Sequence, residues 1–139
     1  MRVLSFLLLG FLAVSWAEVG SPIEMKKDES PKPLREFFGE VAAKVEKGPT
    51  REVILNGEEY EKTWRELGLT QEPGVVDFAK EVVVVSTTRG SRITFRLRDE
   101  GEGRLQVMSI STKDIRPGLR YAFCVLSRSV WKQINDSKM

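Results

Sequence analysis

The apolar and polar positions divide the chain into an apolar N-terminal run, a polar leader and a longer patterned region. Residues 3–14 are almost wholly apolar, with Ser5 and Gly10 as the interruptions. Residues 18–33 carry three prolines, mixed charge and almost no bulky apolar side chains. Such a segment cannot bury enough surface to offset its ordering entropy, so we predict a flexible leader. Residues 34–139 are expected to fold as a single domain.

Residues 57–67 carry the clearest helical pattern. Asn56 or Gly57 is expected to cap this helix, glutamates fill its first turn, and Gly68 ends it. Apolar side chains recur on one face at i, i+4 and i+7, namely Tyr60, Trp64 and Leu67. We expect this face to pack against a sheet, and a binding surface is the alternative.

From residue 80 onward the period of the pattern becomes two, as in β-strands. Four consecutive valines, residues 82–85, predict a strand buried on both faces. Further strands are expected from alternation or short apolar runs, at 51–55, 91–98, 104–109 and 119–126. Residues 34–47 fit either a helix or a strand, and the type of the tail at 130–134 stays open. The prediction is an α+β domain, a mainly antiparallel sheet of about five or six strands with one packed helix.

The N-terminal run has the parts of a cleavable signal peptide. Arg2 precedes the apolar residues, and Ser15 and Ala17 supply the small side chains that a signal peptidase reads. We therefore predict a signal peptide over residues 1–17. The alternative, a membrane anchor, needs roughly 20 apolar residues. We expect an exported protein, periplasmic or extracellular, without a stable membrane anchor.

Charge and composition narrow the expected chemistry. The chain has 22 basic and 20 acidic residues, and removing Arg2 with the signal leaves 21 against 20. That balance argues against a general binder of nucleic acid or anionic membranes, which needs excess positive charge. Histidine is absent, and Cys124 is the single cysteine. We interpret Cys124 as a small buried hydrophobe, and a reactive thiol is the alternative.

No catalytic, metal or cofactor motif stands out, so we expect no catalytic residues, no metal and no cofactor. Acid–base hydrolysis by paired carboxylates remains as an alternative. The candidates are Asp77 with Glu81, and the cluster Asp99, Glu100 and Glu102.

A basic face is the most distinctive local pattern. Arg92, Arg96 and Arg98 alternate with apolar residues, and Arg89 and Arg104 extend the set. Like charges on one face of a strand repel one another unless neighbours or a ligand compensate. One interpretation is a docking patch for an acidic partner, centred on Arg89, Arg92, Arg96 and Arg98. The other is a solvated face whose arginines pair with glutamates of an adjacent strand.

One stretch resembles a known family. Trp64 in a short helix leads through Pro73-Gly-Val-Val-Asp77-Phe78-Ala-Lys-Glu81 into the valine-rich strand and then Gly90. This resembles the C-terminal domain of the protease complex subunit PrcB and related secreted proteins, over about residues 50–110. Where many relatives carry a Thr-Gly-Gly-Tyr-like stretch, this chain reads Arg-Gly-Ser-Arg-Ile-Thr-Phe at 89–95.

The resemblance implies a non-catalytic, exported domain that associates with a secreted or envelope protease. Our first hypothesis is therefore an accessory domain that binds another exported protein through the hairpin at 89–98. The alternative is a module for a small ligand or lipid, which requires an apolar pocket beneath Tyr60 and Trp64. A small carboxylate-dependent hydrolase comes third. Within the motif, Asp77 is expected to accept backbone hydrogen bonds where the valine strand begins.

Overall fold

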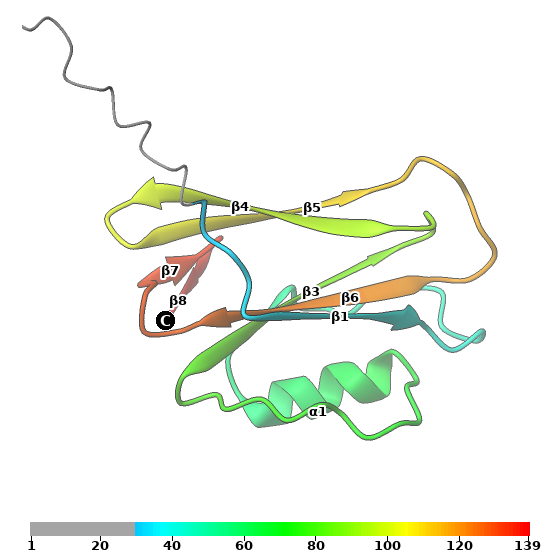
Figure 1. Cartoon of the computed structure of the whole chain (residues 1–139). Helices are drawn as coiled ribbons and strands as arrows, with labels where there is room; N and C mark the ends of the chain where they lie inside the picture. Colours follow the sequence, from blue (N-terminus) through cyan, green and yellow to red (C-terminus); the bar gives the residue numbers. More distant parts are fainter. Residues whose placement is uncertain (1–29) are drawn as a thin grey trace, which may run out of the picture.

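The computed structural model describes residues 30–139 (Figure 1). The predicted signal peptide and most of the predicted leader lie outside the described residues, and residues 30–33 form neither helix nor strand. This part of the chain contains one helix, α1 (Gly57–Glu66), and eight strands. The strands are β1 (Arg35–Glu40), β2 (Val53–Ile54), β3 (Glu81–Thr88), β4 (Ile93–Gly101), β5 (Arg104–Ser111), β6 (Arg120–Ser127), β7 (Gln133–Ile134) and β8 (Ser137–Lys138).

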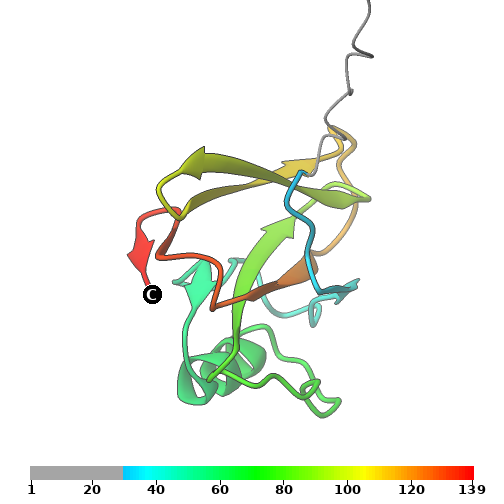
Figure 2. The ribbon, with the colours of Figure 1, turned by 60° about the vertical axis from the view of Figure 1, so that its left-hand side comes forward.

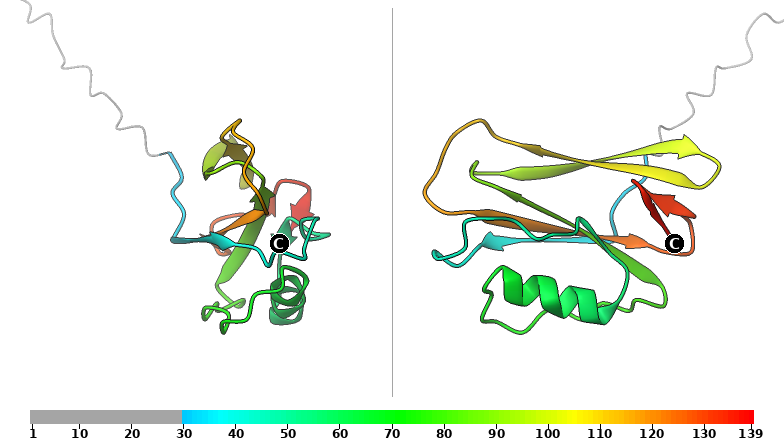
Figure 3. Two further views of the ribbon diagram at one scale, coloured as in Figure 1. Left: turned by 90° about the vertical axis from the view of Figure 1, so that its right-hand side faces the viewer. Right: turned by 180° about the vertical axis from the view of Figure 1, so that it is seen from behind.

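The strands form two four-stranded sheets. Sheet A has the order β1-β6-β3-β2, and sheet B has the order β4-β5-β7-β8. All neighbouring strands are antiparallel except β5 and β7. The helix covers one face of sheet A and sheet B lies over the other, which gives three layers (Figures 1 and 3). The predicted α+β class, mainly antiparallel with one helix, is confirmed.

The strands occupy two sheets and number eight, where the sequence predicts one sheet of five or six. The β4–β5 hairpin buries one face, which carries Ile93, Phe95 and Leu105, and the side chains of the opposite face are exposed or half-buried. Such a hairpin buries its apolar face by lying over another sheet. Figure 2 shows it crossing sheet A on the side away from α1. The strands beyond the predicted number are β7 and β8, of two residues each, and β2, which lies within the strand expected at 51–55, is also two residues long.

The central strands β3 and β6 carry apolar side chains on both faces. Val83 and Val85 of β3 lie in the core beneath α1, whereas Val82 and Val84 lie in the core between the sheets. β6 alternates in the same way, with Phe123 on the helix side. The burial on both faces that the four valines predict is therefore confirmed, and these strands separate two cores.

The helix begins and ends close to the predicted residues. The side chain of Asn56 caps it by accepting the backbone N–H of Glu59 at 2.9 Å. Trp64 stacks on Phe123 with ring centroids 5.6 Å apart, and its Nε1 donates to the carbonyl of Gln71 at 2.7 Å. The aromatic face packs on sheet A, as expected.

The space beneath Tyr60 and Trp64 is filled by rings. The ring of Tyr60 lies 5.9 Å from that of Trp64, 5.7 Å from that of Phe78 and 5.8 Å from that of Phe123. Aromatic groups at such separations are in mutual contact. The pocket that a lipid-binding alternative requires at this place is therefore occupied by the protein's own side chains.

The two segments whose secondary structure the sequence leaves undecided both contribute strands to the sheets. Residues 34–47 form β1 in their first half and irregular chain thereafter, with Val41 buried in the helix-side core. The C-terminal tail forms the short hairpin β7–β8, which buries Ile134 fully. Asn135 at its turn has φ +49°, and its side-chain amide accepts from and donates to the backbone of Val107 at 2.8 and 3.2 Å. This pair of bonds fixes the tail to β5.

Candidate functional site

Arg96 and Arg98 lie together on the outer face of sheet B. Both are exposed, and the register places Met108 opposite Arg96 and Gln106 opposite Arg98 on β5. Residues directly opposite in an antiparallel pair share a face. We call the surface formed by Arg96, Arg98, Gln106, Met108 and Ile110 the outer face.

Among the described residues, no acidic side chain pairs with the two arginines of the outer face. Within residues 30–139, the hairpin's own ion pair joins Arg104 to Glu102 at 3.9 Å, at the far turn, and neither Arg96 nor Arg98 has an acidic partner within 4.0 Å. Among these residues neither arginine therefore has the glutamate partner of the second interpretation, although both are solvated as that interpretation expects. Two large apolar side chains lie exposed beside them instead, Met108 at 40% and Ile110 at 47%. The outer face is basic and apolar.

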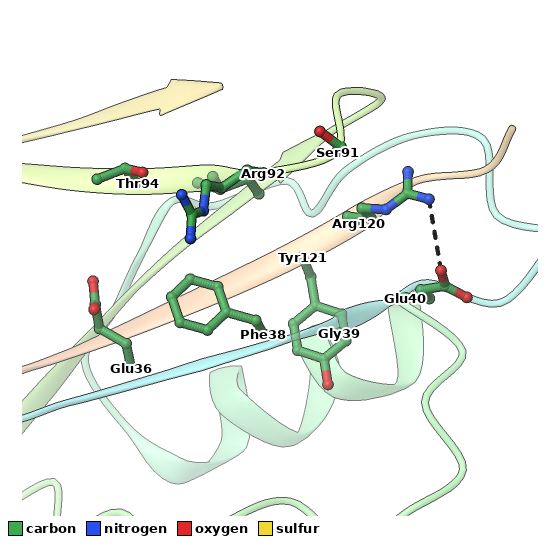
Figure 4. Close-up of a pocket in the computed structure, with 10 residues that line it drawn as sticks. Glu36, Phe38, Gly39, Glu40, Ser91, Arg92, Thr94, Arg120 and Tyr121 are labelled. Atoms are coloured by element: carbon green, nitrogen blue, oxygen red, sulfur yellow. Dashed lines mark ion pairs between the residues drawn. The ribbon is translucent and has the colours of Figure 1, made fainter. Parts of the chain in front are cut away.

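The other two arginines of the predicted patch lie elsewhere. Arg89 is in the exposed turn between β3 and β4, where its carbonyl accepts from the backbone of Arg116 at 2.9 Å. Arg92 precedes β4 and lines a groove between the sheets, and its guanidinium points toward the ring of Phe38 (Figure 4). The structure thus brings Arg96 and Arg98 together and separates Arg89 and Arg92 from them.

The groove lies between β1 at the edge of sheet A and the beginning of β4 at the edge of sheet B. Its volume is about 640 Å³. Its wall on sheet A carries Glu36, Phe38 and Glu40, and Glu40 pairs with Arg120 at 3.6 Å (Figure 4). The lining combines one exposed aromatic ring with two charges of each sign, since Arg92 and Arg120 balance the two glutamates.

Gly90 and the residues around it hold the β3–β4 turn against the β5–β6 loop. Gly90 is buried, and a Cβ at this position would overlap the carbonyl oxygen of Thr112. Asp114 accepts from the backbone and hydroxyl of Ser91 at 3.0 and 3.1 Å and from Arg116 at 3.0 Å. Hydrogen bonds from Thr112, Ser91 and Arg116 hold the pKa of Asp114 well below its usual range. The glycine serves close packing of two loops.

The remaining motif residues also make structural contacts. Asp77 accepts the backbone N–H of Ala79 at 3.1 Å, so the expected capping role at the start of β3 is confirmed. Phe78 packs against the helix-side core, and Pro73 lies half-buried in the irregular segment between α1 and β3. Together with Trp64, these residues fix the path from the helix into β3.

The candidate carboxylates are engaged in local contacts. Glu81 accepts a two-pronged hydrogen bond from Arg35 at 2.7 and 2.8 Å, which lowers the pKa of Glu81. Asp99 accepts the N–H of Gly101 at 2.8 Å in the turn. Within residues 30–139 no group of three or more potential metal ligands converges. Asp77, Glu81 and Asp99 thus make structural contacts, and a lowered pKa makes Glu81 a poor proton donor near neutral pH.

Cys124 is fully buried between the sheets, where desolvation raises the pKa of its thiol to about 12. A neutral, inaccessible thiol matches the interpretation as a small hydrophobe. The helix of the described region, ten residues long, is too short to span a bilayer.

Several groove residues escaped the sequence analysis, above all Phe38, Glu36 and Arg120. One signal for Phe38 is present in the sequence, because adjacent side chains of a strand point to opposite faces. With Phe37 packed against the helix-side core, Phe38 must face the other way, and it is 56% exposed. Because residues 34–47 fit a helix as well as a strand, the pattern alone does not decide which way Phe38 faces.

Comparison of the chain with protein-family models, with curated proteins and with solved structures finds no match, so the resemblance to the PrcB family stays a prediction.

Proposed function

We propose that the chain is a non-catalytic, exported accessory domain that binds an acidic surface of another exported protein, for which a protease is the candidate that the PrcB resemblance suggests. The observation that carries the proposal is the outer face. Arg96 and Arg98 stand two residues apart on one strand with Met108 and Gln106 opposite them. Within residues 30–139 they have no acidic partner, so a partner's carboxylates would relieve their mutual repulsion.

The composition of this face suits a protein partner. Arginine and methionine are enriched at protein interfaces, where apolar groups supply contact area and arginine supplies directional hydrogen bonds. A sheet face without an enclosing wall fits another macromolecule better than a small ligand, which proteins usually enclose in a concave site.

The test compares capture of envelope proteins by the purified wild-type chain and by the double variant Arg96→Gln/Arg98→Gln. A second double variant, Lys44→Gln/Arg65→Gln, removes the same charge from exposed positions outside sheet B and is the matched control. We expect one acidic exported protein to be captured by the wild type and the control, and at least tenfold less by the outer-face variant, since losing each charged contact costs roughly 1 kcal/mol or more. Equal capture of this protein by all three chains would contradict the proposal.

A further inference from the structure

β1 presents a free edge to solvent. Among the strands described, it pairs with β6 alone and ends the order of sheet A (Figures 1 and 3). The N–H of Val41 donates to the carbonyl of Leu119 at 2.9 Å in the register of the strand, so the odd-numbered residues from 35 to 41 are those bonded to β6; ahead of the strand the N–H of Leu34 also donates to β6, to the carbonyl of Val125 at 2.8 Å. Because successive backbone groups alternate, the N–H and C=O groups of Glu36, Phe38 and Glu40 point away from the sheet. Within residues 30–139 no other strand pairs with these groups, so they can pair with an added strand.

This edge lacks several devices that usually protect exposed strands. β1 is six residues long and regular in register, with no proline and no lysine between residues 35 and 40. Proteins typically blunt such an edge with proline, charged side chains, above all lysine, a bulge or a covering segment; the charges that β1 carries are those of Arg35, Glu36 and Glu40. At its centre Phe38 is 56% exposed and projects into the groove. An added strand would cover this ring and place every second side chain in the groove.

Charge disfavours a second copy of this chain paired with β1 about Phe38. Two β1 strands paired antiparallel about Phe38 would bring Glu36 of each copy opposite Glu40 of the other. Like charges directly opposite are destabilising. A different polypeptide with a basic side chain opposite Glu36 has the complementary charge. Glu40 is already paired with Arg120, so a basic side chain opposite Glu40 would add less stabilisation.

We infer that β1 binds an extended segment of another polypeptide by antiparallel strand addition, with an apolar side chain opposite Phe38 and a basic side chain opposite Glu36. The backbone groups of β1 supply the hydrogen bonds, and the groove supplies the side-chain selectivity. This surface is distinct from the outer face, so the inference does not depend on the proposed function.

The probe is a blocked peptide of sequence Thr-Lys-Thr-Val-Thr-Lys-Thr, titrated into the full-length protein while amide hydrogen exchange is followed by NMR. Before addition, the amides of Glu36, Phe38 and Glu40 should exchange quickly, whereas those of Phe37 and Gly39, bonded to β6, should be protected. On saturation, exchange at the first three amides should slow by about tenfold or more, since they gain hydrogen bonds. Exchange at Phe37 and Gly39 should change little.

Two controls separate strand addition from loose adhesion. A peptide methylated at the backbone nitrogens of valine and lysine loses the N–H donors that face β1 and should not bind. A peptide methylated at the backbone nitrogens of the threonines between them keeps those donors and should bind. A peptide with glutamate in place of lysine should bind the wild type two- to tenfold more weakly than the lysine peptide does. The same glutamate peptide should bind the variant Glu36→Lys two- to tenfold more tightly than it binds the wild type. Both changes are those expected for one cross-strand charge pair. The variant Arg96→Gln/Arg98→Gln should bind the lysine peptide as the wild type does.

Several outcomes would overturn the inference. One is the absence of binding by the lysine peptide up to about millimolar concentration, which is weak even for a single strand. Another is equal binding by both methylated peptides. A third is spectral change around Arg92 and Tyr121 without protection at the edge, which would mark the groove as a small-ligand site.

Discussion

Phe38 and Phe123 offer a direct test of how β1 is placed, because the same substitution should have very different costs at the two positions. Phe123 is fully buried and contacts the rings of Tyr60, Trp64 and Tyr121. Phe38 is 56% exposed in the groove and belongs to neither core. We therefore compare Phe123→Ala with Phe38→Ala.

The expected costs follow from burial. Replacing a fully buried phenylalanine by alanine removes its transfer free energy and leaves a cavity, at a cost of about 3–5 kcal/mol. Full burial of such a side chain is itself worth about 1.5–3 kcal/mol. A little under half of Phe38 is covered, and the open groove leaves no enclosed cavity, so we expect Phe38→Ala to cost about 1 kcal/mol.

Urea unfolding followed by circular dichroism gives both free energies by linear extrapolation, provided that the slope with urea stays the same in all three proteins. A domain of this size has roughly 5–15 kcal/mol of stability, so both variants should be measurable unless the total is at the low end. If Phe38→Ala cost as much as Phe123→Ala, Phe38 would lie in the core. The register of β1 would then be shifted by one residue, which exchanges its two faces, and the free edge described above would be wrong.

Three further predictions concern packing and titration. Gly90→Ala should lower the melting temperature, because the new Cβ overlaps a backbone carbonyl. Gly57→Ala is the control, since no atom lies within 4 Å of its new Cβ, and it should leave the melting temperature unchanged or raise it. Equal effects of the two substitutions in thermal denaturation would contradict this. Because the pKa of Glu81 is lowered by Arg35, its stabilisation is present above the unfolded value of about 4.3 and is lost as the pH falls through the folded-state pKa. Glu81→Gln should therefore cost at most about 1 kcal/mol near neutral pH in urea titrations, with a shrinking difference toward acid, and a constant difference would refute the assignment. Cys124, with its pKa raised to about 12, should react with a thiol reagent at mildly alkaline pH only as fast as the protein unfolds, and rapid labelling of the native protein would contradict its burial.

The helix and strands could be predicted wherever the sequence pattern fits one type of secondary structure only. Four consecutive β-branched valines at 82–85 have no polar side to expose, so a strand buried on both faces follows directly. The helix at 57–67 carries its own cap and stop residues. The division of the strands into two sheets was missed, because alternation shows that a strand has one apolar face and does not show what covers it.

The candidate site was predicted in part for a similar reason. Alternation correctly placed Arg96 and Arg98 on one face, but strand pairing decides which residues lie opposite them. Met108 and Gln106, not glutamates, occupy those positions. Arg92 belongs by alternation to the same side, yet its place before β4, at the sheet edge, turns its side chain toward the groove. The groove itself joins residues about 50 to 80 positions apart, which no local pattern reveals.

We propose that the outer face of sheet B contacts an acidic exported protein. The most direct measurement places a photo-crosslinking amino acid at Met108, which lies opposite Arg96, in cells that make the protein, with the same group at Lys44 as the control. We expect one dominant adduct from Met108, formed with an acidic exported protein. This adduct should be lost when Arg96 and Arg98 are changed to glutamine and absent from Lys44. The same adducts from both positions, or an adduct that persists without the two arginines, would contradict the claim.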